Sequence, residues 1–148
     1  MIEVLILKRL LLAIVLGAII GFERERAHKV AGLRTHMLVC VSSTLFTLLA
    51  LYGFEETTPE SSSRIIANII LGIGFIGGGT IIRHESHVMG TTTAATLWTV
   101  AGVGIAVGSG FIYPAVIVTL LAYGILTVLW RLEIKLDAEK DPGNGKTP

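Results

Sequence analysis

Gly72, Gly74 and Gly77 reproduce the G-x-G-x-x-G spacing with which dinucleotide-binding folds cradle a pyrophosphate. That motif works only where a β-strand ends and a helix begins, with an acidic residue about 20 positions later. Here the glycines lie inside one apolar run, and nothing around them alternates a strand with a soluble helix. The sequence therefore predicts another role for these glycines and no nucleotide site.

Polar and ionisable residues gather where four apolar stretches meet their connections. Such groups are unfavourable near hydrocarbon unless they are paired or hydrated, so they are candidates for function. We expect Glu23 and Arg34, each flush against an apolar run, to form a buried pair. Arg24 and Arg26 fit an interface anchor and a functional group equally well. The predicted functional polar cluster contains Glu23, Arg34, Thr35, Arg83, Thr92, Thr93 and Thr96.

A cation site is weakly indicated at the same level. Magnesium prefers oxygen ligands and retains several waters, so Glu23, Glu25 and Glu85 with threonine hydroxyls are its candidates. The neighbouring arginines argue against this site, and an anion or a phospholipid headgroup suits them better. His28, His36, His84 and His87 lack a transition-metal spacing and are interpreted as interfacial polar residues. Because no nucleophile stands beside a base, we expect no enzyme and no cofactor.

The composition is that of a membrane protein. Hydrophobic residues make up 52% of the 148 residues and charged residues only 16%, whereas soluble domains have about 25% charged residues. A net charge of +1 gives no sign of a nucleic-acid partner. The single cysteine, Cys40, can form neither an internal disulfide nor a thiolate metal cage, so we interpret it as an apolar packing residue.

Apolar stretches of the length needed to cross a bilayer predict an all-α, polytopic bundle of about five transmembrane helices. Lys8 and Arg9 interrupt the first stretch, and we expect both to snorkel toward the interface. No small-residue cleavage site follows that stretch, which argues against a signal peptide. The predicted spans are residues 4–22, 36–54, 65–82, 93–107 and 112–130.

The distribution of lysine and arginine predicts the orientation, because cytoplasmic loops carry the excess. The connection at residues 23–35 and the C-terminal end are basic, whereas the connection after the second span is mostly acidic. We therefore expect an N-out, C-in protein of a bacterial or archaeal cytoplasmic membrane. Residues 1–132 form one predicted transmembrane domain, and residues 133–148 form a polar, disordered tail.

Close helix packing explains most of the glycines. Three pairs have the G-x-x-x-G spacing that lets helix backbones approach in lipid: Gly17 with Gly21, Gly74 with Gly78, and Gly104 with Gly108. The third span also holds Gly72, Gly77 and Gly79, which lie around the helix rather than on one face. It is either packed on two sides, which we favour, or unwound at residues 77–79 so that its backbone faces an ion path.

Four segments carry a family resemblance: "GFERE" (21–25), "AGLRTHMLVCV" (31–41), "GIGFIGGGTIIR" (72–83) and "GTTTAATLW" (90–98). In order and spacing they resemble the MgtC/SapB membrane proteins. The resemblance implies about five transmembrane helices and a link to magnesium homeostasis, growth at low magnesium and survival of pathogens in macrophages. It also implies an accessory role more than a pump, with an effect on ATP synthase. Thr92, Thr99 and His84 depart from residues common in the family.

These observations predict an accessory or regulatory membrane protein of magnesium or ion homeostasis. It would act in the lipid bilayer by packing its glycine-rich spans against a second copy or a partner complex such as ATP synthase. The alternative is a small oligomeric ion channel or transporter with a path near residues 77–79. A membrane-embedded enzyme is the third class, and no catalytic set supports it.

Overall fold

The computed structural model describes residues 2–54, 58–83 and 87–130. Its spanning helices are α1 (Ile2–Arg26), α2 (Leu33–Tyr52), α3 (Pro59–Gly78), α4 (Thr91–Ser109) and α5 (Ile112–Gly124), which continues as the π-helical turn η1 (Ile125–Leu129). All five passes are long and apolar enough to cross a membrane. The predicted helical bundle is therefore confirmed, and the chain is a multi-pass membrane protein.

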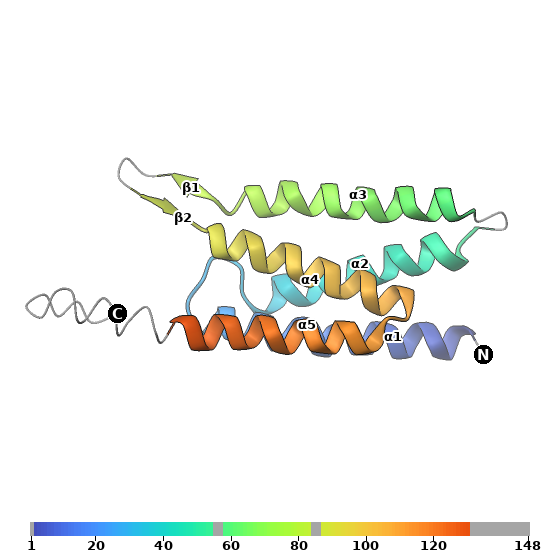
Figure 1. Cartoon of the computed structure of the whole chain (residues 1–148), viewed down its shortest axis with the longest axis horizontal. Coiled ribbons are helices and arrows are strands. Elements are labelled where there is room, and N and C mark those ends of the chain that lie inside the picture. The colour runs from blue at the N-terminus through green and yellow to red at the C-terminus, as the bar shows by residue number, and fades with distance from the viewer. Residues whose placement is uncertain (1, 55–57, 84–86, 131–148) are drawn as a thin grey trace, which may run out of the picture.

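The helices run alternately up and down the long axis of the bundle (Figure 1). The α1–α2 connection, the hairpin of β1 (Ile82–Arg83) and β2 (Val88–Met89), and η1 share one end, here called the hairpin end. The N-terminus and the α2–α3 and α4–α5 connections share the opposite end. Helix α4 contacts all four other spanning helices, whereas α3 and α5 have no mutual contact of similar extent.

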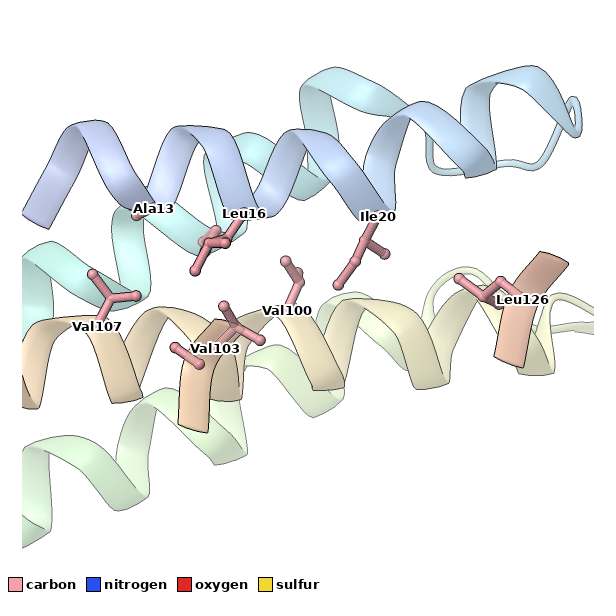
Figure 2. Packing of buried hydrophobic residues seen from close by; sticks show 9 residues of the cluster. Ala13, Leu16, Ile20, Val100, Val103, Val107 and Leu126 are labelled. Atoms are coloured by element: carbon pink, nitrogen blue, oxygen red, sulfur yellow. The ribbon is translucent and has the colours of Figure 1, made fainter. Parts of the chain in front are cut away.

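Side chains of α1 and α4 form the main apolar core. Figure 2 shows Ala13, Leu16 and Ile20 of α1 pointing toward the valines of α4, with Leu126 farther along the same cluster. Cys40 of α2 is fully buried in this core, in line with its predicted packing role. The core is therefore centred on α1, α2 and α4.

Glycines of α1 and α4 bring both helices against the backbone of α2. A Cβ atom built at Gly17 would lie 2.9 Å from Cβ of Cys40, and one at Gly21 would lie 2.9 Å from Cα of Leu33. From the α4 side, a Cβ at Gly104 would lie only 2.4 Å from the Cys40 carbonyl oxygen, and Gly108 meets Thr47 in the same way. Helix α2 is thus held between two glycine-containing faces.

Helix α3 begins and ends earlier than the predicted span of residues 65–82. Thr58 accepts a hydrogen bond from the Ser61 amide at 3.2 Å, and the Ser61 hydroxyl accepts one from the Thr58 amide at 3.0 Å. This capping box and Pro59 at the first position start the helix within residues that we expected to be loop. At the other end, Gly77 and Gly78 form the last turn and Gly79 is the C-cap. The glycine triplet is therefore a helix end and not an unwound segment within the span.

Arg9 has a structural partner at the end of the bundle that holds the N-terminus, while its predicted snorkelling stays a prediction. Its guanidinium donates a hydrogen bond of 2.7 Å to the Gly108 carbonyl and lies 6.0 Å from the centre of the Tyr52 ring. It therefore satisfies a carbonyl in the last turn of α4, while Lys8 is exposed. Residues 2–9 belong to α1. The predicted tail at residues 133–148 lies outside the described residues.

The packing predicts that Gly104→Ala destabilises the bundle, because the added methyl would overlap the Cys40 carbonyl. We expect a loss of about 1–3 kcal/mol, as for other overpacked cores. Gly102→Ala is the matched control, since a Cβ there on the same helix meets no atom within 4 Å. Unfolding in mixed detergent micelles measures both, and equal stability of the two variants would contradict the close approach of α2 and α4.

Candidate functional site

A buried ion pair lies where α1 reaches the hairpin end. The Arg24 guanidinium donates from Nε to one Glu23 oxygen at 2.5 Å and from Nη2 to the other at 2.8 Å. Glu23 is 8% exposed and Arg24 3% exposed. The predicted pairing of Glu23 with Arg34 is wrong, because Arg34 is exposed on the first turn of α2 and the neighbouring Arg24 takes its place.

Glu25 stabilises the start of α2. Its Oε2 atom accepts a hydrogen bond of 3.0 Å from the Leu33 amide, which satisfies one of the free donors of the first turn. Gly32 makes room for this carboxylate, since a Cβ atom there would lie 1.7 Å from Oε2. Of the weak cation candidates, Glu23 and Glu25 are thus engaged within the chain, and Glu85 lies outside the described residues. Within the described ranges, no group of three His, Cys, Asp or Glu residues could hold a metal ion.

His36 links α2 to α4. The fully buried imidazole donates from Nδ1 to the Gly32 carbonyl at 2.8 Å, and its Nε2 lies 3.0 Å from the Thr96 hydroxyl oxygen. Thr96 in turn donates to the Thr93 carbonyl at 2.8 Å. His36 is therefore not the interfacial residue that we expected but a polar link inside the bundle.

The predicted polar cluster divides into buried and exposed members. Glu23, Thr93 and Thr96 are buried at the hairpin end, and Thr35 is half-buried. Thr92 is exposed on the first turn of α4, and Arg83 is exposed on β1. The structure therefore gathers only part of the cluster with Arg24 and His36.

Two small pockets flank the buried ion pair. The first, with a volume of about 240 Å³, lies between Glu23 and Arg26 of α1 and Tyr123 and Thr127 near the end of the last span. The second, here called the Lys29 pocket, has a volume of about 330 Å³. Its polar wall contains Arg24, Lys29, Thr92 and Thr93, and its apolar wall contains Ile125, Leu126, Leu129 and Trp130.

Sequence reasoning missed the part of the last span in these pockets. Tyr123, Thr127 and Trp130 line one or both of them. Aromatic residues near a membrane interface were the available signal, because tyrosine and tryptophan concentrate at the level of the headgroups. Lys29 was counted only as a topology signal.

Three glycines of α3 have open space where a side chain would stand. Cβ atoms built at Gly72, Gly74 and Gly78 meet no atom within 4 Å, and one at Gly77 makes only ordinary contact with Ala94 at 3.5 Å. Beside them, Phe75 is 87% exposed. An apolar groove of about 560 Å³ separates α3 from α2 and is lined by Leu38, Phe46, Ile69, Gly72 and Ile76 among others.

The ion pair predicts a strong energetic coupling between Glu23 and Arg24. Arg24→Met leaves a buried carboxylate without its partner, so we expect a loss of about 3–5 kcal/mol of stability. The double variant Glu23→Gln/Arg24→Met removes both charges and should be more stable than Arg24→Met alone. A double-mutant cycle by detergent unfolding measures this coupling, and strictly additive losses would show that the two side chains do not act as a pair.

Comparison with known proteins identifies relatives of this chain. The chain is 44% identical to Protein MgtC of Salmonella typhimurium (strain LT2) over 112 residues, which are 76% of this chain and 47% of that relative. It is 36% identical to the "Putative magnesium transporter YhiD" of Escherichia coli K12 over 133 residues, 86% of this chain and 62% of that relative. It thus spans less than two thirds of either relative. No solved structure matches the chain. The MgtC family profile matches residues 10–134, and the chain belongs to the MgtC family.

Proposed function

We propose that the chain is a regulatory membrane protein of magnesium homeostasis that acts by packing α3 against a second membrane helix. The second helix belongs to another copy of the chain or to a membrane complex such as ATP synthase. The proposed location is a bacterial or archaeal cytoplasmic membrane, with the N-terminus outside and the hairpin end in the cytoplasm.

The observation that carries this proposal is the open glycine surface of α3 formed by Gly74 and Gly78, where an added Cβ would meet no atom within 4 Å. Glycine within a helix costs about 1 kcal/mol relative to alanine. In the G-x-x-x-G pairs of α1 and α4 that loss accompanies close contact with α2, whereas no described residue meets these positions of α3. Small residues promote helix association in lipid, which supports the packing of a helix from outside the chain on this surface.

The weak attachment of α3 supports the same proposal. Only 17% of its spanning window is buried, the same share as in the last span, compared with 50% for α4. Ile73 and Gly77 are its buried residues near α4, and the Ser62 hydroxyl donates to the Ala50 carbonyl of α2 at 2.7 Å. The remaining surface of α3 is available to another helix.

The link to magnesium comes from the relatives. The name of the YhiD relative describes a magnesium transporter, and the match covers 86% of this chain. A regulatory role agrees better with the hairpin end, where both oxygens of Glu23 are held by Arg24 and one oxygen of Glu25 is held by Leu33. A dehydrated cation would have to displace these partners.

The proposal predicts that Gly74→Leu and Gly78→Leu abolish association without unfolding the chain, because both side chains would enter open space. Energy transfer between labelled copies in liposomes, and capture of membrane complexes, measure association. Gly102→Leu is the control, since Gly102 is an equally open glycine on α4. Unchanged association of the Gly74→Leu/Gly78→Leu variant with itself and with membrane complexes would overturn the packing role.

A second prediction concerns magnesium. In a bacterium that lacks its own family member, the chain should restore growth at micromolar magnesium, and Gly74→Leu/Gly78→Leu should not. Gly102→Leu should restore growth as well as the original chain. Cation flux through the purified chain in liposomes, abolished by Gly78→Leu but not by Gly102→Leu, would instead favour a channel near residues 77–79.

A further inference from the structure

The Lys29 pocket has the features of an anion site. We propose that it binds the phosphate of a membrane phospholipid, with Lys29 supplying the charge and Thr93 and the start of α4 supplying hydrogen-bond donors. The wall from Ile125 to Trp130 would contact the glycerol and acyl part of the lipid. This inference does not depend on the proposed role of α3.

A backbone motif fixes the position of Lys29. The Lys29 amide donates to the Arg24 carbonyl at 3.0 Å, and the His28 amide donates to the Glu25 carbonyl at 3.0 Å. With His28 in the left-handed region at φ 52°, these bonds form a Schellman motif that ends α1. Lys29 is therefore held beside Arg24 by the helix terminus. Within the described part of the chain it forms no ion pair, so its charge is available to a ligand.

The Thr93 hydroxyl is an unused donor in this pocket. Thr93 is only 3% exposed and lines the pocket, yet its hydroxyl has no hydrogen-bond partner among the described residues. No side-chain polar atom that is fully enclosed in that part of the structure lacks a partner. The Thr93 oxygen is therefore not fully enclosed, and because Thr93 lines the pocket, a ligand oxygen or water there can complete its bonding.

The start of α4 adds donors beside Thr93. Gly90, the N-cap, has φ 88° and provides no side-chain acceptor for the first-turn amides. A Cβ at Gly90 would lie 1.9 Å from the Thr80 carbonyl oxygen, so a capping side chain cannot replace the glycine. Free amides and the helix dipole both favour an anion at such a terminus.

The charges of the pocket favour an anion over a cation. The Glu23 carboxylate neutralises Arg24 through two hydrogen bonds, and Lys29 leaves one positive charge at the polar wall. A phosphodiester carries one negative charge and unshared oxygens for Lys29 and Thr93. Trp130 and Leu129 add apolar lining, as the diacylglycerol part of a phospholipid requires.

Native mass spectrometry of the purified chain with defined lipids tests this site. We expect retention of phosphatidylglycerol but not of monogalactosyldiacylglycerol, which has no phosphate. Lys29→Gln and Thr93→Val should each weaken retention about tenfold, as expected for a lost hydrogen bond to a charged group. Thr93→Ser keeps the hydroxyl and should retain the lipid. Lys8→Gln removes an exposed lysine near the opposite end of the bundle and is the charge control.

Competition with inorganic phosphate distinguishes a lipid headgroup from soluble phosphate as the anion that the site binds. Displacement of phosphatidylglycerol by millimolar phosphate, but not by chloride at equal ionic strength, would show that soluble phosphate shares the site. No displacement would show that the diacylglycerol part is needed. Equal retention of both lipids, or retention by Lys29→Gln and Thr93→Val equal to that of the original chain with all variants folded by circular dichroism, would overturn the proposal.

Discussion

The close approach of α2 to the backbones of α1 and α4 is the constraint on which the rest of the structure depends. Lipid is as apolar as a leucine side chain, so helices in a bilayer gain little from hiding apolar surface and rely on close contact and interhelical hydrogen bonds. The glycines at 17 and 21 and at 104 and 108 provide the contact. They also bring the Thr44 hydroxyl within 2.9 Å of the Gly104 carbonyl and place His36 opposite Thr96.

That contact explains how the hairpin end can hold buried charges. Helices α1 and α2 pack against each other, and the connection between them is short. Glu25 can therefore reach the first amide of α2. Burial of one ionised group in this environment is unfavourable, but the two-bond contact of Arg24 with Glu23 compensates both charges locally. The charged segment "ERER" therefore stabilises the fold through Glu23, Arg24 and Glu25. The groups left for a ligand are those that this network does not use.

The sequence was sufficient for the five spans, because hydropathy and bilayer thickness determine them almost alone. It was insufficient for the ion pair, since residues one position apart on a helix normally point in different directions and Arg34 looked like the better partner. The link from His36 to Thr96 joins positions 60 residues apart, which no local spacing encodes. The early start of α3 was encoded by Thr58, Pro59 and Ser61, but their polarity was interpreted as loop.

Glycine pairs with the same G-x-x-x-G spacing have different structural roles, and only their surroundings distinguish them. The pair at 104 and 108 is filled by α2, so it belongs to the fold, whereas the pair at 74 and 78 faces open space. A side chain added to α3 can therefore alter what binds outside the chain while the contacts of α1, α2 and α4 persist. Helix α3 contacts the core mainly through Ile73, Gly77 and Ser62, whereas the buried ion pair lies on α1. The contacts that hold the buried ion pair are therefore separate from the surface of α3 at which we propose that another helix binds.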